Sequence, residues 1–217
     1  MHWAPWGHFG TVNFYNSFDY NNRKWEFGSW DAIVHLAPIA PTRVLKYAKE
    51  HGSRVLFASS GAVYGSLPQY ADYARAKQEY EQECVESGVD CVIARLFTFC
   101  GETLHRHSLW ELISVAKTGE ITVNSPDTVR SYLYSEDLGR WMWRLLLEGR
   151  GIYDVGGSVP YTMLEVARLV ADVIPAKIQI LNSDPPTRYL PDVTRAHALG
   201  CSETIGLKQA IAKMVTG

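Results

Sequence analysis

Residues 54–77 have the sequence RVLFASSGAVYGSLPQYADYARAK, and this stretch decides the fold class. Its first five residues, RVLFA, are apolar, β-branched and aromatic enough to predict a buried strand. Small polar residues follow at 59–61, as expected where a strand of an open α/β sheet ends and meets its ligand. Turn residues lie between 64 and 68, and a helix is predicted to begin at Tyr70. The stretch therefore predicts a strand, a loop and a helix of an α/β protein.

Three polar side chains of this stretch form a candidate catalytic group. Tyr73 and Lys77 are four residues apart and share one face of the predicted helix, and the loop is short enough for that face to meet Ser60. A phenol with a pKa near ~10 is a poor base at neutral pH, but a nearby ammonium is expected to lower that pKa. Ser60 can hydrogen-bond a reacting oxygen, so the group suits proton transfer at a carbon that bears a hydroxyl. Tyr and Lys at this spacing also occur by chance on amphipathic helices.

The surrounding sequence resembles a known family. SSGAVYG at 59–65 and YARAK at 73–77 resemble the Ser-Ser-x-x-Val-Tyr-Gly and Tyr-x-x-x-Lys signatures of the extended short-chain dehydrogenases/reductases, the sugar-nucleotide epimerase/dehydratase family. The resemblance implies that Tyr73 is the acid/base. It further implies that Lys77 tunes Tyr73 and holds the nicotinamide ribose, and that Ser60 positions a substrate oxygen.

Further segments from residue 31 to the carboxyl end resemble the same family in family order. DAIVHLA at 31–37 is similar to the family's D-x-V-x-H-L-A-A segment, which implies that Leu36 and Ala37 lie beside the cofactor. After the next predicted strand, Thr98 stands where the family usually has a substrate-contacting asparagine. Threonine keeps a hydroxyl but lacks the amide.

Two arginines are candidates for substrate binding. RSYLYSEDL at 130–138 resembles the family's R-x-F-x-x-V-x-D-x-A segment, and Arg130 could offer paired donors to a diphosphate. A surface salt bridge is the alternative role for Arg130. Arg188 opens RYLPD, which resembles the family's carboxyl-terminal segment.

The histidines in HRH at 105–107 lack an acidic partner, so we predict no metal site.

The amino-terminal part departs from the family. A Rossmann fold usually begins with a strand, a glycine-rich turn and a helix, whose amides approach the cofactor pyrophosphate. The sequence contains no G-x-x-G-x-x-G; GHFG at 7–10 has neither a preceding strand nor a good following helix. Either the family's first βαβ unit has been lost, or the chain lacks its upstream piece. We therefore expect NAD or NADP binding that is weak or lost.

Composition narrows the function classes. The 217 residues are 47% hydrophobic and 20% charged, as in ordinary globular proteins. A net charge of −2 argues against nucleic-acid binding. Four scattered cysteines predict reduced thiols in a cytoplasmic protein, and no apolar run approaches the ~20 residues of a membrane span.

Together these features predict an α/β fold: a Rossmann-like parallel sheet truncated at its amino-terminal end, with a small substrate lobe. We assign residues 1–99 and 131–155 to the core, and 100–130 and 156–217 to the lobe. The resemblance implies an NAD(P)-dependent epimerase, dehydratase or reductase acting on a nucleotide-linked sugar. The alternatives are a nucleotide-sugar-binding protein without redox activity, or one half of a split enzyme completed by a partner chain.

The resemblance also implies a homodimer. In relatives, the helix that begins here at Thr42 and the helix that carries Tyr73 pair with their copies in a four-helix bundle. Val44, Leu45 and Tyr47 supply candidate apolar area for that contact.

Overall fold

The main sheet is parallel throughout and carries the residue 54–77 stretch near its centre. The computed structural model describes residues 28–104 and 108–216; GHFG at 7–10 and the HRH histidines at 105–107 lie outside the described residues. The strands of this sheet are β1 (Ala32–His35), β2 (Arg54–Ser60), β3 (Cys91–Leu96) and β8 (Gly151–Val155), in the order β1-β2-β3-β8. The predicted α/β class is confirmed.

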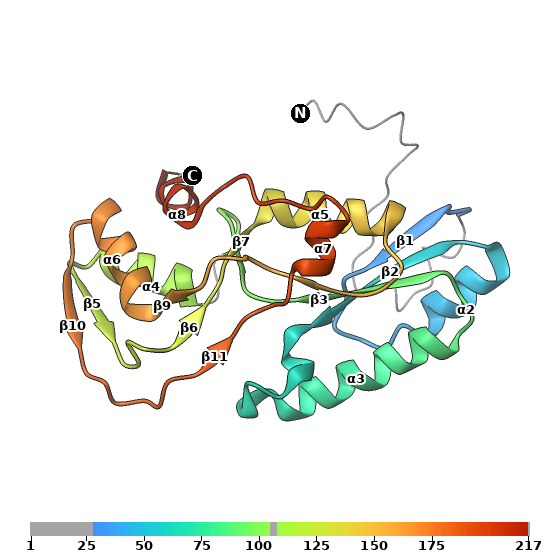
Figure 1. Cartoon of the computed structure of the whole chain (residues 1–217), viewed down its shortest axis with the longest axis horizontal. Coiled ribbons are helices and arrows are strands. Elements are labelled where there is room, and N and C mark those ends of the chain that lie inside the picture. The colour runs from blue at the N-terminus through green and yellow to red at the C-terminus, as the bar shows by residue number, and fades with distance from the viewer. Residues whose placement is uncertain (1–27, 105–107, 217) are drawn as a thin grey trace.

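Helices cover both faces of this sheet (Figure 1). On one side lie α2 (Thr42–His51) and α3 (Ala71–Glu86), and on the other α5 (Ser135–Glu148). Because alternate residues of a strand point to opposite faces, the side chains of β2 pack against both helical layers. Val55 and Phe57 pack in the clusters that include residues of α2, whereas Leu56 and Ala58 pack with Trp141 of α5.

A second group of elements has its own apolar core (Figure 1). It comprises α4 (Ser108–Ala116), β5 (Glu120–Val123), α6 (Met163–Val173), β10 (Lys177–Ile180) and α8 (Leu207–Thr216), with β5 and β10 paired in parallel. Between this group and the main sheet lie β6 (Val129–Arg130), β9 (Tyr161–Thr162) and β11 (Arg188–Tyr189) as one small sheet, and β4 (Phe99–Cys100) with β7 (Leu133–Tyr134) as another. The short helix α7 (Thr194–Ala198) packs against β8 of the main sheet. The domain boundaries given above stay a prediction.

The three residues expected to pair two subunits lie inside this one. Val44, Leu45 and Tyr47 are all buried, against β2 and its neighbours. They face the sheet because α2 is amphipathic and turns its apolar side inward. The expectation that they supply the apolar area for dimer contact was wrong.

None of the helices in 28–104 and 108–216 combines the length and the apolar character needed to cross a bilayer.

The turn after β2 depends on a residue without a side chain. Gly61 opens the 3₁₀ turn η2 (Gly61–Tyr64), directly after Ser60. A Cβ atom at Gly61 would lie 2.5 Å from the Phe97 ring, which fills the space above the turn. A larger residue at position 61 would therefore displace either Phe97 or the turn that holds Ser60.

We predict that Gly61→Ala lowers the free energy of unfolding by about 1–3 kcal/mol, the usual cost of overpacking a well-packed site. Gly139→Ala is the matched control, because Gly139 lies in α5 with nothing within 4 Å of the added Cβ. That change should be neutral or stabilise by up to ~1 kcal/mol. Urea unfolding of both variants checks this, and equal effects at the two glycines would contradict it.

Candidate active site

Ser60 lies where β2 ends and η2 begins. Its Oγ accepts a hydrogen bond from the backbone N–H of Ala62 at 3.2 Å, which caps the 3₁₀ turn. A second short turn, η3 (Pro68–Tyr70), leads directly into α3. The chain therefore returns across the end of β2 with Tyr73 and Lys77 in the first part of α3. The carboxyl end of a parallel strand is where open α/β sheets bind their ligands.

Lys77 is buried and held against β2. Its side chain is 2% exposed, and Nζ donates to the carbonyl of Ala58 at 2.8 Å. Nζ also lies 4.7 Å from the centroid of the Phe57 ring and 5.8 Å from that of Tyr73. Burial lowers the pKa of this ammonium, while nearby Cys84 and Glu81 oppose that change. An ammonium has three donors, so Lys77 keeps hydrogen-bonding capacity beyond its bond to Ala58.

Tyr73 lies at the surface of the site and is 42% exposed. Partial burial raises the pKa of its phenol, and the nearby Ser60 side chain opposes that rise. The expectation of a lowered pKa was wrong for the chain alone. The reason is that the Lys77 ammonium is drawn toward Ala58, so desolvation of the phenolate outweighs attraction to the cation.

A buried charge network fixes the position of α3 relative to the sheet. Glu81 on α3 is 6% exposed and accepts hydrogen bonds from the Ser59 hydroxyl and from Arg95 on β3, at 3.0 Å from Nε and 2.7 Å from Nη2. Arg95 also donates to the Tyr64 hydroxyl at 2.8 Å, and Tyr64 donates to Asp154 at 2.9 Å. The network joins α3, β2, β3, η2 and β8 around Ser60.

Arg130 is engaged with the carboxyl-terminal part of the chain. It donates from Nη1 to the carbonyls of Val129 and Thr187, at 2.8 and 3.2 Å, and from Nη2 to the Thr187 hydroxyl at 2.7 Å. These partners are neutral, unlike the carboxylate that a salt bridge would need. The guanidinium thus keeps its full charge for an anionic ligand, and it is half-buried between β6 and β11.

On β11, the residue that faces the Ser60 site is Tyr189, which the sequence analysis did not select. Tyr189 is 8% exposed and packs on Phe97, whereas Arg188 beside it is exposed. Adjacent strand residues point to opposite faces, so Arg188 is directed away from Phe97 and Ser60. The sequence could not predict this orientation, because a strand of two residues is too short to show an alternating pattern. The contact with Phe97 in the structure reveals it.

The other predicted site residues lie near strand ends. Leu36, 63% exposed, and Ala37 follow β1, whose last residue pairs with Phe57 of β2. Thr98 lies between β3 and β4, and its carbonyl accepts from the N–H of Leu133 at 3.1 Å. Their contacts with cofactor or substrate stay predictions. Within residues 28–104 and 108–216, no three His, Cys, Asp or Glu side chains gather as metal ligands would.

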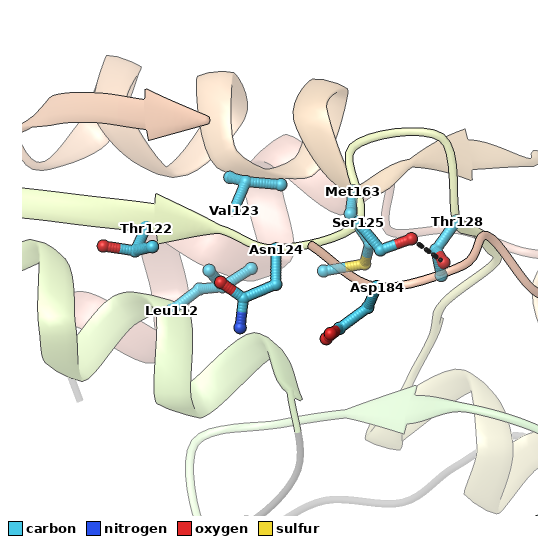
Figure 2. Close-up of a pocket in the computed structure, with 8 residues that line it drawn as sticks. All are labelled: Leu112, Thr122, Val123, Asn124, Ser125, Thr128, Met163 and Asp184. Carbon is cyan, nitrogen blue, oxygen red and sulfur yellow. Dashed lines mark hydrogen bonds between the residues drawn. The ribbon is translucent and has the colours of Figure 1, made fainter. Parts of the chain in front are cut away.

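A cavity of about 180 Å³ lies in the second group of elements (Figure 2). Thr128 on its wall accepts from the Thr187 backbone N–H at 3.0 Å, and Thr187 is also the partner of Arg130. Figure 2 shows Asn124 and Asp184 extending toward the same side. The lining residues are Leu112, Thr122, Val123, Asn124, Ser125, Thr128, Met163 and Asp184. The cavity thus combines apolar walls with amide, hydroxyl and carboxylate groups.

The parallel sheet with helices on both faces defines a Rossmann-like α/β protein, and Ser60, Tyr73 and Lys77 lie at the carboxyl end of one of its strands. The family model for the NAD dependent epimerase/dehydratase family matches residues 22–156, more than half of the chain. The chain belongs to this family, as the sequence signatures predicted.

Curated relatives include plant and animal proteins that are longer than this chain. UDP-glucuronic acid decarboxylase 5 of Arabidopsis thaliana is 28% identical over 81% of this chain and 61% of its own length. UDP-glucuronic acid decarboxylase 1 of Danio rerio is 27% identical over 82% of this chain and 50% of its own length. The chain therefore spans between one half and about three fifths of these relatives.

Solved structures agree on the fold. A dTDP-glucose 4,6-dehydratase from Bacillus anthracis, in complex with NAD, superposes with a TM-score of 0.76 at 16% identity, covering 92% of this chain and 76% of its own. RMD from Pseudomonas aeruginosa, complexed with NADPH, gives a TM-score of 0.71 at 22% identity, covering 86% and 80%.

We predict that Glu81→Gln lowers the free energy of unfolding by about 2–4 kcal/mol. The change leaves Arg95 without its anionic partner, and the value lies toward the low side for buried pairs because Arg95 is partly exposed. Glu79→Gln is the control, since Glu79 is exposed on the same helix. Thermal and urea unfolding measure both. A Glu81→Gln protein as stable as the control would show that the network does not fix α3.

Proposed function

We propose that this chain provides the acid/base and sugar-nucleotide site of an NAD(P)-dependent epimerase, dehydratase or reductase. One observation carries the proposal: Ser60, Tyr73 and Lys77 meet at the carboxyl end of a parallel strand, and Arg130 lies on the neighbouring small sheet. Its substrate would be a sugar linked to a nucleoside diphosphate. The proposal includes two forms of the enzyme: the chain acts alone, or a partner chain supplies the glycine turn.

We assign each part of such a substrate to a set of residues. A sugar hydroxyl would lie between Ser60 and Tyr73, with Tyr73 removing or returning its proton. Arg130 would hold the diphosphate, because a guanidinium binds phosphate oxygens through paired donors. The cavity beyond Thr128 would take the base, whose ring suits the apolar walls and whose polar edge suits Asn124.

The residues at the Lys77 end of the site fit a nicotinamide cofactor. Lys77 is buried but keeps free donors, Tyr73 presents its hydroxyl, and Leu36 and Ala37 follow the adjacent strand. Lys77 and Tyr73 would hold the ribose. The cofactor, when bound, supplies hydride transfer to and from the sugar carbon. The sequence offers no glycine turn for the pyrophosphate, so we propose weak binding by this chain alone.

A nucleotide-sugar-binding protein without turnover is the second candidate, and the missing glycine turn favours it.

We also propose a homodimer in the cytoplasm. Its contact must use residues other than Val44, Leu45 and Tyr47, which are buried within the subunit.

Replacing Tyr73 tests the function. Tyr73→Phe keeps the ring and removes the titrating proton, so turnover should fall by about 10²–10⁴-fold with little change in sugar-nucleotide affinity. Lys77→Met should also abolish most turnover, because it removes the buried ammonium. Tyr80→Phe is the control, since Tyr80 lies on the same helix and packs its ring against Phe57. The assay combines nucleotide sugars, NAD or NADP, and product analysis by mass spectrometry.

The pH profile adds a second readout. Burial raises the pKa of Tyr73, so at neutral pH only a small fraction is phenolate. Where Tyr73 acts as the base, turnover should therefore rise about tenfold per pH unit from neutral toward alkaline pH. Turnover that survives Tyr73→Phe would refute the assignment. Absence of turnover in the parent, with unchanged ligand binding in both variants, would favour the binding protein.

A further inference from the structure

The Lys77 ammonium lies over the ring of Phe57 in the interior of the protein. Phe57 is fully buried and directly precedes Ala58 on β2. The Lys77 Nζ atom is 4.7 Å from the centroid of the Phe57 ring, and the same atom donates to the Ala58 carbonyl at 2.8 Å. Two consecutive residues of one strand therefore contact the ammonium, one through an aromatic face and the other through a carbonyl oxygen.

The Phe57 ring is itself held in place by two other rings. The His35 ring stacks on it, with 5.8 Å between centroids and 19° between the planes, and the Tyr80 ring meets it edge-on at 6.4 Å and 82°. His35 and Phe57 are also paired in the register of β1 and β2. Burial lowers the pKa of the His35 imidazole, so this ring is neutral at neutral pH. The buried Phe57 ring thus presents a fixed face to Lys77.

A buried ammonium needs compensation for the water it has lost. Glu81, one turn further along α3, accepts hydrogen bonds from Arg95 and Ser59. An aromatic face within about 6 Å attracts a cation through the ring quadrupole, and this attraction is stronger away from water. The ring attracts the charge without taking up a conventional hydrogen bond. The Lys77 donors that Ala58 does not use therefore stay available to a ligand.

We propose that Phe57 is a positioning residue: the face of its ring holds the side chain of Lys77 as an ammonium beside Tyr73 and leaves N–H donors for a ligand. The inference rests on the proposed function, in which Lys77 acts on Tyr73 and on the cofactor ribose. Nζ lies 5.8 Å from the centroid of the Tyr73 ring, so an ammonium held on Phe57 is close to the acid/base. An aliphatic residue at position 57 could fill the core but would offer no such face.

The test changes the electrostatics of the Phe57 ring and keeps its shape. Phe57 is replaced by phenylalanines that carry one, two and three ring fluorines, which progressively weaken the negative potential of the ring face. The titration of Lys77 is followed by ¹³C NMR of protein labelled at the lysine ε-carbon, and Lys77→Met assigns its signal. The midpoint should move to lower pH with each fluorine. At a fixed pH below the midpoint, the amine fraction should rise about threefold to tenfold across the series.

The titratable groups that face Lys77 are the same in every member of the series. They are Tyr73, Glu81 and Cys84 on α3, and His35 on β1. Because a phenol titrates in the same alkaline range as an ammonium, the series is made on the Tyr73→Phe background. A shift of the Lys77 midpoint can then be assigned to the Phe57 ring.

Phe97 provides the matched control. It is also a buried phenylalanine, but its ring packs on that of Tyr189, with 4.6 Å between centroids. The same fluorines at Phe97 should leave the Lys77 midpoint unchanged. A midpoint that stays constant along the Phe57 series, or that moves equally in the Phe97 series, overturns the proposal. The predicted shift, together with no turnover by the parent protein, would contradict the proposed enzyme and leave the positioning role intact.

Discussion

The buried ion pair between Glu81 and Arg95 is the interaction on which the site depends. Glu81 belongs to the helix that carries Tyr73 and Lys77, and Arg95 belongs to the strand beside β2. By accepting from Ser59 as well, Glu81 fixes the helix to the residue that precedes Ser60. A shift of the helix by one residue would separate the serine from the tyrosine. Because an unpaired buried charge is costly, the pair selects one register of helix against sheet.

Much of the fold follows from local sequence. The RVLFA run became the first part of β2, which continues through the two serines to Ser60. Tyr73 and Lys77 lie on one helix, α3, where a spacing of four residues puts them on one face. These features depend on residues close together in the chain, so periodicity and turn chemistry predict them. The family signatures then placed the fold class correctly, because they span most of the chain in order.

The features that sequence could not predict all depend on contacts between distant residues. The apolar face of α2 that includes Val44 could pack against the sheet or against a second subunit. The amphipathic pattern of the helix is the same in both cases, so it does not tell which partner buries this face. The direction of the Tyr73 pKa shift depends on where the Lys77 ammonium goes, and it goes to Ala58. Tyr189, on a strand of two residues, packs its ring on Phe97, which lies far from it in the sequence. No local pattern encodes that meeting.

We propose that the end of β2 binds a sugar and that the neighbourhood of Arg130 binds its diphosphate. A crystal structure of the protein with a bound UDP-sugar tests this most directly, because it requires neither cofactor nor turnover. We expect a sugar hydroxyl within hydrogen-bond reach of both Ser60 and Tyr73, phosphate oxygens on Arg130, and the base in the cavity beside Asn124. A ligand bound with its sugar away from Ser60 and Tyr73, or with its diphosphate on groups other than Arg130, would contradict it.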